Sequence, residues 1–261
     1  MVSWRAHRVL GELICSFHSN EIDRLIDSHK HHDSSRYNVD VLEEDVAYVK
    51  LKYGDKGLSY FVLHHYLDRL VDILTSLISE YYESYALGFT KKNLKEIYQE
   101  IRSEAFERLQ LDPKNILTLL VYDLDVVLSA LHILYSGRRK RRERRRYKEI
   151  LSKAYSRIST SGNLQYLRDI VIKVLDGIRD NFDYVLCVVL LDEGFKSRGT
   201  LSKIINALSI KVAKYRYYAS VHSPTYKGVA ERLLDEEKLS SFIKYIVKEA
   251  CSGRQDRLHT T

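Results

Sequence analysis

The sequence contains little proline, little cysteine and no long apolar run without charges. Two prolines, 30% charged and 45% hydrophobic residues among 261 exclude disorder throughout and allow a core in one large or two smaller domains. Cys15, Cys187 and Cys251 lie far apart without a CxxC pair, so we expect small buried residues rather than a zinc site or disulfide framework. No apolar stretch approaches the roughly 18 uncharged residues of a membrane span, and residues 1–10 lack the apolar stretch of a signal peptide. We therefore expect a protein of the virion interior, the cytoplasm or the nucleoid that is not secreted.

Short motifs that bind nucleotides or support hydrolytic catalysis are also absent. The sequence has no GxxxxGK[ST] or GxGxxG phosphate-binding loop, no GxSxG nucleophile elbow and no HExxH zinc motif. These absences argue against a nucleotide-driven motor.

Apolar residues recur at intervals of three and four along nearly the whole chain, which is the period of an amphipathic helix. Only residues 184–191 (YVLCVVLL) resemble a strand, and a helix is favoured there because no second strand is in view to pair with it. The pattern predicts an all-α fold, a bundle-like arrangement of about eight or nine helices. Helices are expected at about 4–29, 41–51, 58–87, 116–135 and 226–250, with Gly54, Gly88 and Asp112-Pro113 as boundaries.

The two halves of the chain carry opposite net charge. Residues 1–137 hold 15 Lys and Arg against 21 Asp and Glu, whereas residues 138–261 hold 27 against 14. We therefore divide the chain into an acidic α-helical half, 1–137, and a basic α-helical half, 138–261. A sign asymmetry of this kind indicates a polyanionic partner for one part of the molecule.

The densest basic segment is 138–148 (RRKRRERRRYK), with nine bases and one acid. As a helix it would match the charge density of duplex DNA, and arginine suits bidentate contacts to phosphate. The alternatives are a solvated basic linker and a face paired with the acidic half. The residues predicted to bind nucleic acid here are Arg138, Arg139, Lys140, Arg141, Arg142, Arg144, Arg145, Arg146 and Lys148.

A second basic segment, within 203–227, mixes bases with tyrosines, a combination that could contact phosphates and stack on bases. Phosphate contact is favoured for its lysines because no acid lies nearby in the sequence. For the tyrosines, packing in the core is an equal alternative. The predicted residues are Lys203, Lys211, Lys214, Arg216, Tyr217, Tyr218 and Lys227.

Histidines are concentrated in the first half, where a set of them alternates with aspartates. The residues, in order, are His7, His32, Asp33, His64 or His65, and Asp123 or Asp125. This order resembles the HD superfamily of metal-dependent phosphohydrolases, in which a His, a His-Asp pair and a later Asp hold divalent metal ions. The resemblance covers about half of the chain and implies a site for a divalent metal such as Mn or Mg. The chain departs from the pattern because polar residues precede the pair and the usual lysine or glycine does not follow it.

The preferred hypothesis is a non-enzymatic protein without a cofactor that coats or packages duplex DNA with little sequence preference. It includes self-assembly or a homologous partner subunit. The abundant charge and single methionine are typical of thermophiles, and the composition resembles virion or chromatin proteins of hyperthermophiles. The alternative is an HD-like phosphohydrolase or nuclease. A helical protein that binds an acidic protein or a membrane surface is a third class.

Overall fold

The computed structural model describes residues 3–28, 38–136, 138–192, 198–221, 225–233 and 235–252. Within these ranges the regular structure is helical and no strand occurs, which confirms the all-α fold. The described helices slightly outnumber the eight or nine predicted. No helix in these ranges combines the length and the apolar character needed to cross a bilayer.

The chain forms two compact units that interleave along the sequence. Unit 1 comprises residues 1–3, 70–106 and 182–261, and unit 2 comprises residues 4–69 and 107–181. Each unit combines segments from the acidic and the basic halves. The two candidate sites that are described in most detail below both belong to unit 2.

Unit 2 begins with two short helices where the sequence predicted one helix over 4–29. α1 (Trp4–Cys15) ends at Ser16, which has a positive φ of 49°, and α2 (Asn20–Asp27) begins after Ser19. The Ser19 hydroxyl accepts a hydrogen bond from the Ile22 amide and caps α2. The prediction of one helix was wrong because it continued the apolar pattern across the polar residues 18–21 (HSNE), where Ser19 starts a new helix.

The long helix α3 (Val39–Ala86) contributes its residues up to Arg69 to unit 2 and the others to unit 1. The Asn38 side chain caps its start, and Gly54, with a φ of 64°, interrupts its helical backbone. Gly88 follows its end with a φ of 71°. The boundaries predicted at Gly54 and Gly88 are therefore confirmed, because glycine adopts this left-handed conformation without steric cost.

The helix predicted at 116–135 is divided in the structure. A short 3-10 helix, η1 (Ile116–Leu120), precedes α5 (Leu124–Leu134). Asp112 does not cap a long helix: its buried carboxylate accepts a hydrogen bond from Arg69 Nε at 2.5 Å. The Asp112 side chain, which the sequence predicted to be a helix cap, thus forms a tertiary contact with Arg69 of α3.

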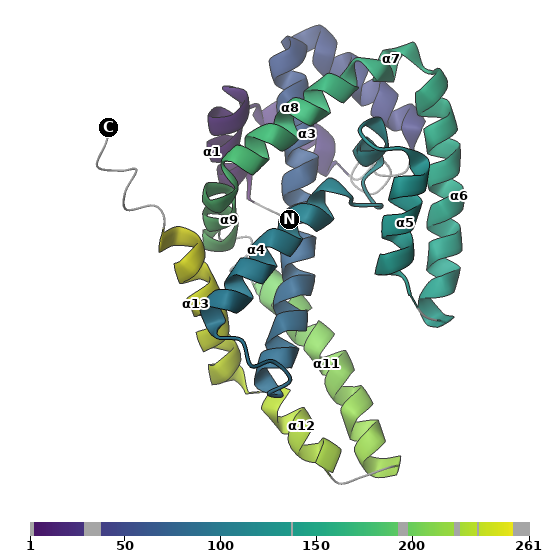
Figure 1. The fold of residues 1–261 in the computed structure, drawn as a ribbon. Helices are drawn as coiled ribbons and strands as arrows, with labels where there is room; N and C mark the ends of the chain where they lie inside the picture. The colour runs from purple at the N-terminus through teal and green to yellow at the C-terminus, as the bar shows by residue number, and fades with distance from the viewer. Residues whose placement is uncertain are drawn as a thin grey trace. The chain divides into compact units, whose positions relative to one another are not determined.

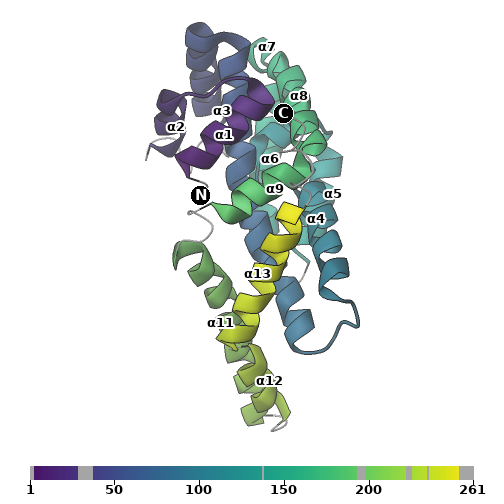
Figure 2. The ribbon, with the colours of Figure 1, turned by 90° about the vertical axis from the view of Figure 1, so that its left-hand side faces the viewer.

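Unit 2 is completed by α6 (Arg138–Thr160), α7 (Gly162–Gln165) and α8 (Leu167–Asp180). α5 and α6 lie side by side (Figure 1), and α8 packs on α1, where Gly177 leaves room for the Ile14 side chain. Figure 2 shows α1 lying against α3 in this unit.

Unit 1 also includes α4 (Leu94–Gln110), α9 (Phe182–Leu191), α11 (Arg198–Val221), α12 (Thr225–Leu233) and α13 (Glu236–Ser252). The helix favoured at 184–191 is confirmed by α9. α11 and α12 lie side by side as a hairpin (Figure 1). Cys187 of α9 and Cys251 of α13 form a disulfide, so the expectation of unpaired buried cysteines was wrong for these two. Their pairing depends on a helix contact across 64 residues, which spacing alone does not reveal.

Candidate functional site

One stripe of side chains anchors α6 to its neighbours. Its members are Arg144, Tyr147, Leu151, Ala154 and Ile158, which are buried or half-buried and recur at intervals of three and four. The Tyr147 ring stacks on Tyr135 with centroids 5.5 Å apart, and the Arg144 guanidinium donates a hydrogen bond to His132 Nδ1. The basic segment is therefore the first part of an anchored helix rather than a solvated linker.

The opposite side of α6 is covered with exposed cations. We call this surface the arginine face; it comprises Arg141, Arg142, Arg145, Arg146 and Lys148. Within the described part of the chain no carboxylate forms an ion pair with these five side chains. At 3.6 residues per turn the four arginines span about 140° of the helix circumference. Their charge is therefore available to an external anion over a broad arc.

Acidic residues of the first half do pair with α6, but near its other end. Arg157 forms ion pairs with Asp40 and Glu43 of α3. The alternative of a basic face paired with the acidic half thus applies to Arg157 and not to the arginine face. Three further predicted residues, Arg138, Arg139 and Lys140, lie in the first turn of α6, and their side chains are outside the described structure.

The second basic segment lies mainly on α11, in unit 1. Lys211 forms an ion pair with Glu83 of α3, and the Tyr215 hydroxyl donates to the same carboxylate at 3.0 Å. The argument that no acid neutralises these lysines is therefore wrong for Lys211. Its partner Glu83 is 128 residues away in the sequence, so a search of the neighbouring residues does not find it. The exposed members are Lys214, Arg216 and Tyr217, whereas the side chains of Lys203, Tyr218 and Lys227 lie outside the described structure.

A second site in unit 2 is a buried cluster of histidines and aspartates. We call it the His–Asp cluster; it comprises His7 of α1, Asp23 and Asp27 of α2, and His64 and Asp68 of α3. His7, Asp23 and His64 have no exposed surface, and Asp68 is 7% exposed. Asp27 is the most open member, with 18% of its side chain exposed.

A glycine allows α1 to approach α3 closely enough to form this cluster. A Cβ atom on Gly11 would lie 2.5 Å from a ring carbon of Tyr60, so only glycine fits there without displacement. His7 precedes Gly11 by one helical turn, and His64 follows Tyr60 by one turn. The contact therefore sets the two histidines opposite each other, with their rings stacked 3.8 Å apart.

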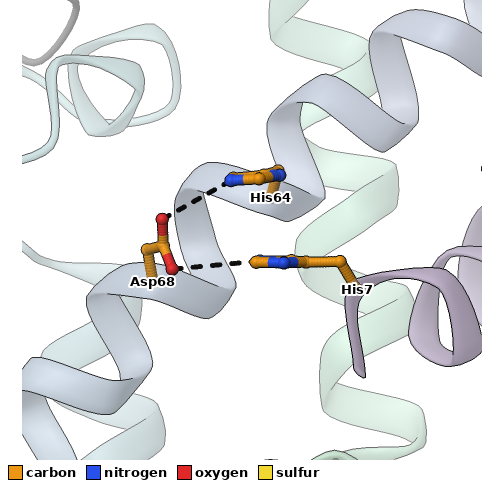
Figure 3. Close-up of side chains that lie close together, drawn as sticks. All are labelled: His7, His64 and Asp68. Atoms are coloured by element: carbon orange, nitrogen blue, oxygen red, sulfur yellow. Dashed lines mark ion pairs between the residues drawn. The ribbon is translucent and has the colours of Figure 1, made fainter. Parts of the chain in front are cut away.

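The carboxylate of Asp68 faces both histidines (Figure 3). Its oxygens lie 3.9 Å from His7 Nε2 and 3.5 Å from His64 Nε2. One oxygen of Asp27 also lies 3.5 Å from His64 Nε2. Ligand atoms of His7, His64 and Asp68 thus converge within 4.8 Å of one another.

Outer hydrogen bonds orient the cluster. The Tyr60 hydroxyl donates to Asp23 Oδ1 at 2.7 Å, and the Trp4 indole N–H donates to Asp27 Oδ2 at 2.6 Å. His64 Nδ1 lies 3.0 Å from Asp23 Oδ1. Because an ionised carboxylate only accepts hydrogen bonds, Nδ1 of His64 is the donor and Nε2 is directed at the other carboxylates.

His7 and His64 are both buried, but their surroundings shift their pKa values in opposite directions. Desolvation, followed by the charge of His64, lowers the pKa of His7 to about 4. Burial also opposes charge on His64, but the hydrogen bond to Asp23 and the carboxylates of Asp27 and Asp68 beside Nε2 outweigh it and raise its pKa well above the ordinary value. The neutral imidazole of His7 therefore stacks on the imidazole of His64, whose protonated form the neighbouring carboxylates stabilise.

The HD-like ligand set is only partly brought together. His7 and His64 meet in the His–Asp cluster, whereas Asp123 and Asp125 are exposed at the start of α5. His65 is half-buried, with its ring against Phe61. The final pair of candidates, His32 and Asp33, lies outside the described residues.

Three members of the cluster were missed from the sequence: Asp23, Asp27 and Asp68. In a continuous helix His7 and Asp27 would lie about 30 Å apart at 1.5 Å per residue, so the predicted single helix concealed their proximity. The spacing of His64 and Asp68 by four residues was the available signal, since it places both on one face of a helix.

Comparison with models of known protein families, with curated proteins and with solved structures found no match. The functional argument therefore depends on the geometry of this chain.

Proposed function

We propose that this protein binds duplex DNA with little sequence preference through the arginine face of α6. The observation that supports this best is the division of α6 into an anchored stripe and an exposed side whose cations have no ion pair within the described structure. A rigid helix holds the charges in a fixed array, so binding an anion orders fewer groups than binding by a mobile tail.

Three electrostatic features of α6 favour an anionic ligand. Arg141 and Arg145, like Arg142 and Arg146, are like charges four residues apart, each pair costing about 0.2–0.5 kcal/mol. The first turn has no acidic residue, so the positive end of the helix dipole lies beside further positive charge. Arg141 to Lys148 extends over about 10 Å, a length along which duplex DNA presents about six phosphates. Phosphates would relieve both kinds of repulsion.

The exposed Arg216 and Tyr217 of α11 support a secondary role for unit 1. A base and a ring on one helix can fix the register of a protein on its ligand through phosphate contact and stacking. Lys211 contributes less to this role than its sequence suggests, because Glu83 already compensates its charge.

We infer a packaging role within a virion or nucleoid, with self-assembly along the DNA. Sequence-independent charge contacts suit a protein that covers DNA rather than one that selects a site. For a protein that acts inside a cell, the disulfide fits a hyperthermophilic source, because intracellular disulfides persist chiefly in hyperthermophiles.

The test compares two variants that lose the same number of charges. In the first, Arg141, Arg142, Arg145 and Arg146 become alanine. The matched control replaces four other exposed cations of unit 2, Arg5, Lys56, Arg168 and Lys173, by alanine. Fluorescence anisotropy with a random-sequence duplex at fixed salt measures the affinity of each.

We expect the first variant to bind much more weakly and the control to stay within a few fold of wild type. At about 0.9 per lost phosphate contact, the salt slope of the first variant should be less steep by up to about 3.6. Equal losses in both variants would show that net charge alone matters and would contradict a specific surface on α6.

A further inference from the structure

We propose that the His–Asp cluster binds one divalent transition-metal ion, with His7, His64 and Asp68 as ligands and Asp27 completing the site. The ion would lie between α1, α2 and α3 of unit 2. This inference is independent of DNA binding, because none of these residues belongs to the arginine face.

The separations of Asp68 from the two histidines fit a shared ion better than direct hydrogen bonds. Because the two rings stack in parallel 3.8 Å apart and each lone pair lies in its ring plane, the His7 ring has to turn from this position for both nitrogens to reach one ion. Two ligands bonded to one metal at about 2.1 Å are about 3.0–3.4 Å apart when adjacent and about 4.2 Å apart when opposite. The distances of 3.5 Å and 3.9 Å from Asp68 to His64 and His7 lie within this range. At 3.9 Å the contact between His7 and Asp68 is too long for a hydrogen bond.

His64 is arranged as metal-binding histidines commonly are. Its Nδ1 donates to Asp23, which fixes the ring and leaves Nε2 directed at Asp27 and Asp68. A carboxylate on the far nitrogen orients a ligating imidazole and increases its basicity. Without a cation the lone pair of Nε2 would face two carboxylates, so a proton or a metal ion must lie there.

Several buried atoms of the cluster have no hydrogen-bond partner. These are both ring nitrogens of His7, Nε2 of His64, one oxygen of Asp23 and one oxygen of Asp27. Buried polar groups are nearly always satisfied, so five unsatisfied atoms in one cluster require an explanation, and a bound ion would satisfy them together. The cluster also places three carboxylates beside two imidazoles, an excess of negative charge that a divalent ion would compensate.

The donor set identifies the class of metal. Two imidazoles with one or two carboxylates suit Zn²⁺, Fe²⁺ or Mn²⁺, whereas Mg²⁺ and Ca²⁺ prefer sites made only of oxygen. The Trp4 hydrogen bond holds Asp27 at the more open side of the cluster, which gives an ion a route of entry.

The first test is a calorimetric titration of the full chain with Zn²⁺ alone, after treatment with a chelator and desalting. We expect one tight site per chain in wild type and a weaker site for Mn²⁺. Asp68→Asn should weaken Zn²⁺ binding by more than the roughly 10–100-fold that follows the loss of a residue hydrogen-bonded to a metal ligand. Asp125→Asn makes the same change at an exposed aspartate and should leave the affinity unchanged.

His7→Phe separates a metal site from a merely structural cluster. Phe keeps the stacking on His64 and removes two nitrogens that have no hydrogen bond. We expect its metal-free melting temperature to equal or exceed that of wild type. In wild type, Zn²⁺ at 100 times its Kd should raise the melting temperature by about 5–10 °C, and in His7→Phe this rise should disappear.

Two results would overturn the proposal. One is the absence of a saturable site near one ion per chain. The other is loss of the tight site in His32→Ala, a change outside the proposed ligands, while Asp68→Asn and His7→Phe retain it.

Discussion

The disulfide between α9 and α13 permits a quantitative prediction for the stability of unit 1. The bond closes a loop of 64 residues, which include α11 and α12. In the chain-entropy account a loop of this length stabilises the folded state by about 4 kcal/mol, mainly by restricting the unfolded chain. Replacing Cys187 and Cys251 by alanine should remove this contribution. Alanine is preferred to serine because Cys187 is 1% exposed, so a serine hydroxyl would be buried there.

Thermal unfolding followed by circular dichroism measures the effect. Because a loss of 1 kcal/mol in the free energy of unfolding lowers the melting temperature by about 2–4 °C, the double variant should melt about 8–16 °C below wild type. Reduced wild-type protein should melt near the double variant, and Cys15→Ala, which changes no crosslink, should melt near oxidised wild type.

A thiol count tests the pairing itself. Protein purified without reductant and unfolded in denaturant should contain one reactive thiol per chain, that of Cys15. Three thiols, or a melting temperature of the double variant equal to that of wild type, would refute the assignment of the disulfide and its role in unit 1.

Three further predictions concern unit 2. Asp112→Ala leaves the buried charge of Arg69 without its carboxylate, so the free energy of unfolding measured in urea should fall by about 3–5 kcal/mol, and a loss below 1 kcal/mol would contradict the buried pair. Burial raises the pKa of Cys15 to about 12 from an ordinary 9.0, so its thiolate is scarce at pH 8 and alkylation of the native protein should be about 1,000-fold slower than in denaturant. Gly11→Ala should destabilise the protein by about 1–3 kcal/mol and weaken Zn²⁺ binding, because the added Cβ displaces Tyr60 and separates α1 from α3; unchanged calorimetry would contradict this account of the cluster.

The fold class and several helix boundaries could be predicted from sequence, because they depend on local patterns. The apolar period identified α9 as a helix, and Gly54 and Gly88 marked boundaries through backbone conformations that glycine favours. No glycine or proline marks the turn at Ser16, and the available signal was the polar stretch 18–21 (HSNE), which separates Phe17 from Ile22 and contains the capping Ser19.

The sites depend more strongly on tertiary contacts. The arginine face was visible as a run of charge, although the stripe that anchors it required the structure. Asp23 and Asp27 fell within the single helix predicted over 4–29 and are brought against His64 only by the turn between α1 and α2. The pairing of Lys211 with Glu83 likewise depends on a contact between distant segments.

The salt dependence of DNA affinity tests the central claim most directly. Anisotropy titrations of wild-type protein with a random-sequence duplex, repeated across a series of salt concentrations, give log K against log salt. If the arginine face and its neighbours neutralise about six phosphates, the slope should be near −5, from about 0.9 per phosphate, and should be the same for a second duplex of unrelated sequence. A flat salt response, or no measurable binding at low salt, would contradict the account.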